Sequence, residues 1–409
     1  MKWAQGIDKF GLFLYLLLCG FAVANIYSVE PASGIRQGVW LGVSLFVGLI
    51  IFLVRAKFFE NMAGIIYIIG VLLLIGLFPF GTEILGQKNW YKFGPVSLQP
   101  VEFAKIGTAL LLANYVSGPD FNLKYKKSLW SSLAIIGVPA VVVMLIPDAG
   151  SLLVFTAFFI ALFREGLSGY VFVVGFGIAA VFLVALAINP WYVIAAIVAL
   201  AAILLYANSH RIPWNILSVT MIVVGVSLLS LLAWEAPRVL DKMPKHQRER
   251  IEVLYKGERA FRDTSGYNLL YSKTAIGSGG FWGKGYREGS VTRGKFVPEQ
   301  STDYIFCTVG EEWGFFGSTL LVICYSIFIG RIYYLSEKQK SIFNRVFGYS
   351  FASILMIHFV INLGMVMGLF PTVGIPLPFF SYGGSSLLAF STMTFIFFKL
   401  NYTDRNSLV

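Results

Sequence analysis

Long apolar runs separated by short polar loops constrain this chain more than any other feature. The runs cover residues 10–28, 37–54, 62–79, 100–117, 129–147, 151–163, 168–187, 191–207, 214–234, 304–330, 346–370 and 384–399. About 20 apolar residues cross the hydrocarbon core of a bilayer as a helix, and in lipid only helices and closed barrels satisfy every backbone hydrogen bond. The sequence therefore predicts an all-α, polytopic membrane bundle of about twelve transmembrane helices.

Composition agrees with a membrane protein and argues against a nucleic-acid partner. Of the 409 residues, 57% are hydrophobic and 13% are charged, whereas soluble domains carry about 25% charged residues. The net charge is +11, but the basic residues are spread over many short loops without a nucleic-acid motif. Membrane topology and anionic lipid explain these residues better. We therefore expect contact with a membrane and none with nucleic acid.

The basic residues of the short loops predict the orientation of the chain. Only three lie on the predicted outer side: Arg36, Lys88 and Lys92. Fifteen lie on the cytoplasmic side: Lys2, Lys9, Arg55, Lys57, Lys124, Lys126, Lys127, Arg164, Arg211, Arg331, Lys338, Lys340, Arg345, Lys399 and Arg405. Because short cytoplasmic loops carry an excess of Lys and Arg, both termini are expected in the cytoplasm. The predicted parts are N-terminal membrane helices (1–234), an extracytoplasmic loop suited to an active site (235–303) and C-terminal membrane helices (304–409), all in one membrane domain.

The long outer loop has two parts of different composition. The stretch "DKMPKHQRERIEVLYKGERAFRD" (241–263) mixes basic and apolar residues, as an interfacial helix does. The stretch "IGSGGFWGKGYREGS" (276–290) is rich in glycine but is no Walker A loop. Ser278 stands where the first glycine would be, and Gly285 stands where a Ser or Thr would follow the lysine. We expect a loop with positive φ angles there rather than a phosphate cradle.

Ionisable residues inside a span are costly, so each is a candidate functional residue. Glu102 and Lys105 stand three apart, on one helical face. They form either a structural ion pair or a site in which Lys105 offers its charge to a phosphate while Glu102 orients it. The residues His210, His246 and His358 are far apart in the sequence, and we expect ordinary surface or core roles for them.

The stretch "KFVPEQSTDYIFCTVGEEWG" (295–314) brings acids to the start of an apolar run. Asp303 precedes the run, where it is either a helix-start acid or a functional group. Glu311 and Glu312 follow about two helical turns deeper, and we expect them to face the bundle interior in a network with Arg or Lys. Asp148, in "PDAGS", is expected to be an N-cap or a functional residue.

Five motifs then identify a family. The stretches "QPVEFAK", "PDAGS", "SKTAIGSGGFWGKGY", "VPEQSTDYIFCTVGEEWGFFG" and "NLGMVMGLFPTVGIPLPFFSYGGSS" resemble, in order, the motifs of the SEDS family (shape, elongation, division, sporulation). The resemblance runs from about residue 10 to residue 400. It implies a core of ten spans, so the extra pair here would lie within about 165–234.

The resemblance implies a peptidoglycan glycosyltransferase that polymerises lipid II on the outer face of the bacterial cytoplasmic (inner) membrane, for cell-wall elongation and rod shape. It also implies a class B penicillin-binding protein as partner. In that family the acid of the "PE…TD" motif is catalytic, which maps onto Asp303, and a Glu and Lys pair maps onto Glu102 and Lys105. The chain departs from the family pattern at Asn89, Val101 and Tyr271, so we assign no role to these side chains.

The chemistry implied needs an activated sugar hydroxyl and a stabilised undecaprenyl diphosphate leaving group. An inverting transfer needs one carboxylate base, which we assign to Asp303. For the diphosphate, Lys105 is the first candidate, with Lys273 and Lys284 behind it. Ser385 either contacts substrate or belongs to the scaffold. The sequence has no metal motif, and a divalent cation such as Mg²⁺ bridging an acid and the diphosphate stays open.

Two other classes of protein fit twelve spans with buried charges: a transporter that flips lipid II and a non-catalytic scaffold of the cell-wall synthesis complex. A transporter would concentrate its polar residues near the middle of the membrane and show an internal repeat. The sequence shows no such repeat, and its acids gather toward the outer face. This distribution favours chemistry at the surface over transport.

Overall fold

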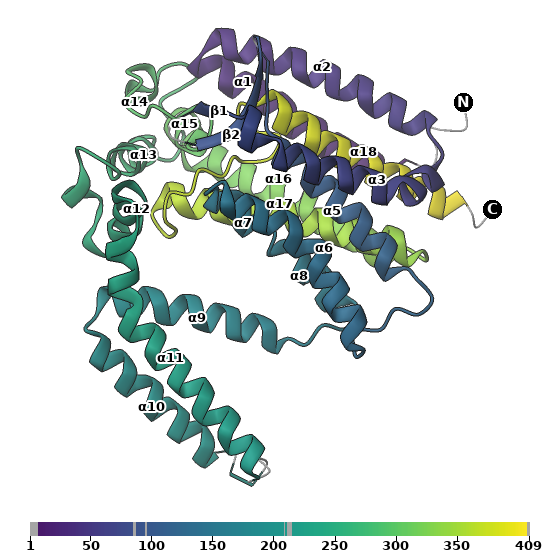
Figure 1. Ribbon diagram of the computed structural model, residues 1–409. Coiled ribbons are helices and arrows are strands. Elements are labelled where there is room, and N and C mark those ends of the chain that lie inside the picture. Colours follow the sequence, from purple (N-terminus) through teal and green to yellow (C-terminus); the bar gives the residue numbers. More distant parts are fainter. Residues whose placement is uncertain (1–6, 85–86, 95, 208, 211–214, 407–409) are drawn as a thin grey trace. The chain divides into compact units, whose positions relative to one another are not determined.

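The computed structural model describes residues 7–84, 87–94, 96–207, 209–210 and 215–406. The chain forms two compact units, one of residues 1–167 and 267–409 (unit 1) and one of residues 168–266 (unit 2). Figure 1 shows the elements of both units. The predicted cytoplasmic ends of the chain, Lys2 and Arg211 lie outside the described residues, and the predicted division at 234 and 303 stays a prediction.

Unit 1 is a helical bundle with one small sheet (Figure 1). Its helices are α1 (Lys9–Val29), α2 (Pro31–Leu53), α3 (Ala56–Ile75), α4 (Leu77–Phe80), α5 (Pro100–Val116), α6 (Lys126–Leu145), α7 (Ala149–Val154), α8 (Ala157–Arg164), α13 (Tyr267–Ser278), α14 (Ser290–Arg293), α15 (Ile305–Glu312), α16 (Gly314–Glu337), α17 (Ile342–Met367) and α18 (Gly384–Asn406). Its strands are β1 (Thr82–Ile84), β2 (Gln87–Phe93) and β3 (Val96–Leu98).

The predicted helical fold is confirmed, because each predicted apolar run coincides with one helix or a broken pair of helices. Among the described residues, nine helices have both the length and the apolar composition of a membrane span. The predicted runs 100–117, 151–163 and 384–399 correspond to α5, to α7 with α8, and to α18, which are not among those nine. The count of twelve spans therefore stays a prediction.

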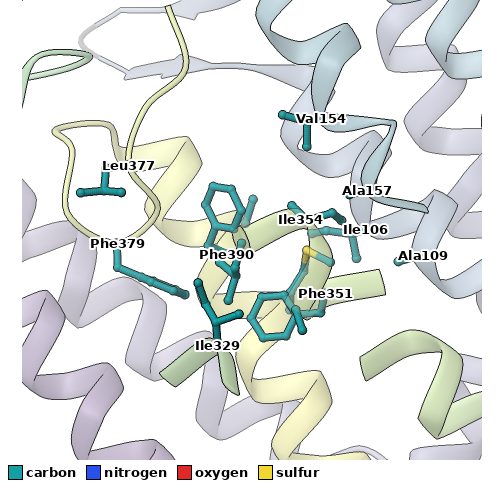
Figure 2. Close-up of a cluster of buried hydrophobic side chains, with 14 of the residues drawn as sticks. Ile106, Ala109, Val154, Ala157, Ile329, Phe351, Ile354, Leu377, Phe379 and Phe390 are labelled. Atoms are coloured by element: carbon teal, nitrogen blue, oxygen red, sulfur yellow. The ribbon is translucent and has the colours of Figure 1, made fainter. Parts of the chain in front are cut away.

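The core of unit 1 surrounds α17, which packs against α5, α8, α16 and α18. Figure 2 shows where these elements meet, with side chains from all of them and from the segment that follows α17. Those labelled are Ile106, Ala109, Val154, Ala157, Ile329, Phe351, Ile354, Leu377, Phe379 and Phe390. Leu377 and Phe379 are almost fully buried, so the non-helical segment after α17 is fastened into the core by its own apolar side chains.

The segment before α5 forms a small antiparallel sheet that the sequence analysis did not predict. The strand order is β1-β2-β3, with Thr82 opposite Trp90 and Tyr91 opposite Leu98. Strand β3 packs against α18, and the backbone N–H of Gln99 donates to Ser385 Oγ at 3.3 Å. The sheet thereby fixes the start of α5, the helix that carries Glu102 and Lys105.

Unit 2 contains α9 (Tyr170–Ala187), α10 (Pro190–Ala207), α11 (Ile216–Lys242), α12 (Lys245–Lys256) and the 3₁₀ helix η2 (Glu258–Phe261). A small cluster of Ala185, Val193, Ala233 and Ala236 joins α9, α10 and α11. Most other apolar side chains of these three helices are exposed, which suits contact with lipid. Helix α12 confirms the helix predicted in the basic and apolar stretch, and its Val253 is buried.

Candidate active site

Asp303 lies just before α15, half-buried, with its carboxylate against the segment that follows α17. Its Oδ2 atom is 3.2 Å from the position that a Cβ would occupy at Gly374. The Asp303 carbonyl accepts a hydrogen bond from Asn362 Nδ2 at 2.8 Å. Helix α15 has Tyr304 at its N-cap, so Asp303 stands one residue before the capping position. Asp303 therefore stands at the start of α15 without being its N-cap, and its role as a helix-start acid or a functional group stays a prediction.

The segment 368–383, here called the broken segment, is non-helical and rich in proline and glycine. Asn362 also donates to the Ile375 carbonyl at 2.7 Å. Ser381 Oγ accepts from the Leu377 N–H at 2.8 Å and donates to the Thr302 carbonyl at 2.7 Å. These bonds tie the broken segment to Thr302 directly and to the Asp303 carbonyl through Asn362, so they fix the backbone that carries the carboxylate.

Glu102 and Lys105 form a buried ion pair at 2.8 Å, with side chains 2% and 1% exposed. Lys105 Nζ is also 2.9 Å from His358 Nε2, and His358 Nδ1 is 3.0 Å from the Pro376 carbonyl oxygen. Because that oxygen can only accept, Nδ1 carries the proton and Nε2 accepts from the Lys105 ammonium. The chain of contacts runs from α5 through α17 to the broken segment, two residues from Gly374. A contact of Lys105 with phosphate stays a prediction.

Lys273 lies on α13, a helix that packs against α15 and α17. Its side chain is exposed, and its Nζ is 3.7 Å from the position of a Cβ at Gly368. Gly368 and Gly374 both have positive φ, at 80° and 73°, and both belong to the broken segment. An exposed ammonium and the Asp303 carboxylate therefore border the same short stretch of backbone.

Glu311 is fully buried and accepts hydrogen bonds from a predicted lysine partner and from two backbone N–H groups. Lys284 Nζ is 2.7 Å from Oε1, the Val291 N–H donates to Oε1 at 2.9 Å, and the Thr292 N–H donates to Oε2 at 2.7 Å. Thr292 Oγ1 donates as well, at 2.6 Å. The network predicted for Glu311 is confirmed, and it holds Lys284 at 27% exposure.

The glycine-rich loop packs its backbone against the junction of α15 and α16. The N–H groups of Lys284 and Gly285 donate to the Glu311 and Glu312 carbonyls, each at 3.0 Å. At Gly283, φ is +81° and a Cβ would lie 2.2 Å from the Glu312 carbonyl oxygen. The predicted positive φ angles are confirmed, and glycine is required because the two backbones approach so closely.

The remaining predicted residues have separate places. Ser385 is buried at the start of α18, where it accepts from Gln99. Asp148 is the N-cap of α7, with its Oδ1 accepting from the Ser151 N–H at 2.9 Å. Asn89, one of the departures from the family pattern, donates to Asp148 Oδ2 at 3.1 Å. Val101 is buried and Tyr271 stacks on Phe296.

Sequence reasoning gave His358 an ordinary surface or core role and missed Asn362, whereas the structure places both between their partners and the broken segment. They stand four residues apart and therefore on one face of the predicted span 346–370. Two polar side chains at this spacing in an apolar run are the signal that could have identified them. For metal binding, no group of three or more His, Cys, Asp or Glu side chains gathers within the part of the chain that the structure describes.

Comparison with known proteins agrees with this fold. The model of the FtsW, RodA and SpoVE family, described as "Cell cycle protein", matches residues 4–201 and 176–406. The chain belongs to this family, which is the SEDS family.

Among curated relatives, the peptidoglycan glycosyltransferase MrdB of Escherichia coli (strain K12) is 30% identical over 383 residues, covering 92% of this chain and 89% of that protein. The peptidoglycan glycosyltransferase RodA of Treponema pallidum (strain Nichols) is 26% identical over 445 residues, covering 97% and 98%.

Two solved structures share the fold. A chain from work on the structural coordination of polymerization and crosslinking by a peptidoglycan synthase complex matches with a TM-score of 0.72 at 25% identity, covering 98% of both chains. The rod shape determining protein RodA of Thermus thermophilus matches with a TM-score of 0.63 at 23% identity, covering 97% of both chains. The multi-pass helical architecture is therefore that of the family.

Proposed function

We propose that this chain is a peptidoglycan glycosyltransferase that polymerises lipid II at the outer face of the bacterial inner membrane, for cell-wall elongation and rod shape. Membership in the family and the names of the curated relatives support this activity. The observation that carries the proposal is the placement of Asp303, whose carboxylate is half-buried beside Gly374 and whose backbone is fixed by Asn362.

Asp303 acts as the general base in this proposal. Its carboxylate accepts the proton of the acceptor sugar hydroxyl while the oxygen attacks the anomeric carbon of the donor, and the bond to the diphosphate breaks with inversion. A base in this role contributes on the order of 10²–10⁴-fold in rate. The hydrogen bonds from Asn362 and Ser381 matter because a base must be held within hydrogen-bond reach of its proton.

The leaving diphosphate needs cations whose contacts strengthen as charge develops. Exposed Lys273, beside the same broken segment as Asp303, suits this role best. Lys284, partly exposed in its pair with Glu311, is placed second. Buried Lys105, matched by Glu102 and His358, acts in this proposal through Pro376 by positioning the broken segment.

A divalent cation is compatible with this site in one arrangement. Because no group of three or more ligating side chains gathers among the described residues, Mg²⁺ would be held by Asp303 together with diphosphate oxygens, as Mg²⁺ prefers few carboxylates and substrate phosphate. Such an ion would supply charge to the leaving group. In the assay below, loss of polymerisation in EDTA and its recovery with Mg²⁺ support this arrangement.

A class B penicillin-binding protein is the proposed partner. The support is the likeness to a chain from a peptidoglycan synthase complex in which polymerization and crosslinking are coordinated. Undecaprenyl diphosphate is the proposed second product, and both termini are proposed to be cytoplasmic.

The test is polymerisation of labelled lipid II by the purified full-length protein, alone and with its transpeptidase partner, read as glycan strands on a gel. The proposal predicts strands that depend on this chain. Translocation of lipid II in proteoliposomes without strands would instead identify a flippase. Failure in both assays, with binding of the partner retained, would identify a scaffold.

A further inference from the structure

A cavity of about 440 Å³ opens beside the C-terminal end of α15, and the proposed reaction does not use it. It lies between the α1–α2 turn at Ser28 and the loop that carries Tyr286 and Arg287. Arg293 and Glu312 also line it. All of these residues belong to unit 1.

Glu312 gives this cavity an unsatisfied acid. Its side chain is 2% exposed, and Oε1 accepts a hydrogen bond from Ser28 Oγ. Its other oxygen, Oε2, has no hydrogen-bond partner among the described residues. The backbone and the charge of Arg287 also act on this carboxyl, and a ligand that brings an ammonium would supply the donor that Oε2 lacks.

Two arginines line the same cavity. Arg287 has a φ of +65°, an unfavourable conformation for a residue other than glycine, and its guanidinium lies 5.9 Å from the centre of the Tyr27 ring. Arg293 is exposed at the end of α14. Tyr286 remains a neutral neighbour, because burial raises the pKa of its hydroxyl, which donates to the Ala24 carbonyl. The arginine charges are therefore not matched by a phenolate.

The cavity thus presents separated charges of both signs, since exposed Glu288 lines it as well. Two arginines and two glutamates suit a ligand that itself carries both an ammonium and a carboxylate. Val29 and Pro31 are the apolar residues in its lining, which leaves little apolar surface for acyl chains. This lining favours a peptide over a lipid headgroup.

We propose that this cavity binds the peptide stem of the substrate, with Glu312 receiving a side-chain ammonium of the stem and Arg287 and Arg293 receiving a carboxylate. The inference rests on the proposed function, because its substrate, lipid II, joins a disaccharide-pentapeptide to undecaprenyl diphosphate. Helix α15 lies between Asp303 and the cavity, and its eight residues span about 12 Å. An extended pentapeptide reaches about 17 Å, so a stem attached to a sugar at Asp303 can reach the cavity.

The first test is binding of a soluble peptide to the full-length protein in detergent micelles, by calorimetry. The probe contains a lysine and a free C-terminal carboxylate, and its comparison peptide has an acetylated lysine. We expect the wild type to bind the lysine peptide at least about tenfold more tightly, as loss of one charge-assisted hydrogen bond implies. Equal affinities would overturn the proposal.

Substitutions in the cavity test which residue binds the ammonium of the ligand and which binds its carboxylate. Glu312→Gln should remove the preference for the unmodified lysine, and Arg293→Gln should remove the preference for a free carboxylate over a carboxamide. Arg55→Gln, beyond the far end of α2 from the cavity, is the control and should keep both preferences. A lysine preference that persists in Glu312→Gln, or competition by phosphatidylethanolamine added to the micelles, would contradict a peptide site.

The second test separates this inference from the proposed activity. Lipid II with a lysine stem and lipid II with an acetylated stem are compared in the polymerisation assay, and wild type should show a kcat/KM at least about tenfold higher for the lysine stem. Polymerisation at equal kcat/KM would defeat the stem site and leave the proposed function standing. A wild type that makes no strands from either substrate defeats the proposed function itself, whatever the peptide affinities.

Discussion

The Lys105 ammonium is tolerated inside an apolar bundle because it forms an ion pair with the Glu102 carboxylate and donates a hydrogen bond to His358 Nε2. The same contacts explain how a residue buried at 1% exposure can matter for chemistry. His358 Nδ1 in turn donates a hydrogen bond to the Pro376 carbonyl. Pro376 lies two residues from Gly374, which borders Asp303. The buried charges of α5 and the backbone of Asp303, the proposed base, are therefore both hydrogen-bonded to the broken segment, the first through His358 and the second through Asn362.

We predict that Lys105→Met lowers the free energy of unfolding by about 3–5 kcal/mol, because Glu102 is left buried without its cation. Thermal unfolding in detergent measures this loss. The double variant Glu102→Gln with Lys105→Met should recover much of the stability. If it also recovers polymerisation, Lys105 acts by positioning, and a stable but inactive double variant would instead favour direct contact with phosphate. Arg164→Met, in an exposed pair with Glu337, is the control and should cost less than about 1 kcal/mol.

Gly374 provides a second prediction about a single residue. Gly374→Ala should cost about 1–2 kcal/mol for its left-handed backbone, and its new Cβ would lie 3.2 Å from Asp303 Oδ2. Gly94→Ala, at φ +58° with no atom within 4 Å of the new Cβ, is the matched control for strain alone. Polymerisation should fall in Gly374→Ala and not in Gly94→Ala. Equal rates in the two variants would remove Gly374 from the site.

The junction of α15 and α16 shows what a sequence predicts and what it does not. The apolar run 304–330 predicted one span, and the structure divides it at Gly314, where φ is +63°. The break is stabilised by distant residues, because the N–H groups of Phe315 and Phe316 donate to the carbonyls of Gly280 and Phe281. Periodicity along the chain carries no information on such pairing, so the run was predictable and the break was not.

The small sheet could not be predicted from the sequence, whereas part of the candidate site could. Strands β1 to β3 are short and lie between helices, where local composition gave no strand signal strong enough to predict. Asp303, Glu102 and Lys105 were predictable because charge in an apolar run is rare. Their connection through His358 depends on the packing of α5 against α17, which is tertiary structure.

For the glycine-rich loop we predict that Glu311→Gln loosens residues 284–292. A glutamine has one acceptor oxygen in place of two, so Lys284 and the N–H groups of Val291 and Thr292 cannot all keep their partner. Hydrogen exchange at Val291 and Thr292 should accelerate at least about tenfold. Glu299→Gln, whose carboxylate accepts from Thr302 Oγ1, is the comparison. Unchanged exchange at both amides would show that the network does not hold the loop.

The bundle as a whole is defined by its orientation in the membrane as well as by its helices. The nine helices with span-like length and composition, counted among the described residues, allow either orientation, and the asymmetry of basic residues selects one. The proposed site requires that α15 and the loop around residue 284 face the outside, because the proposed polymerisation takes place there.

Labelling with a membrane-impermeant maleimide tests this orientation. Arg262→Cys, exposed in the long loop, should react in intact spheroplasts, and Lys340→Cys, exposed between α16 and α17, should react only after lysis. Of the three native thiols, Cys19 and Cys307 are buried and Cys324 is half-buried, so wild type is the blank from which the background signal is subtracted. The reverse pattern would place the proposed site in the cytoplasm.

The decisive measurement is lipid II polymerisation by Asp303→Asn, a change that keeps the shape of the side chain and removes the base. We predict a loss of at least about 100-fold in rate, with thermal unfolding unchanged from wild type. Asp120→Asn, an exposed residue in the α5–α6 turn, is the matched control and should polymerise normally. Strand synthesis by Asp303→Asn at the wild-type rate would contradict the assignment of Asp303 as the catalytic base.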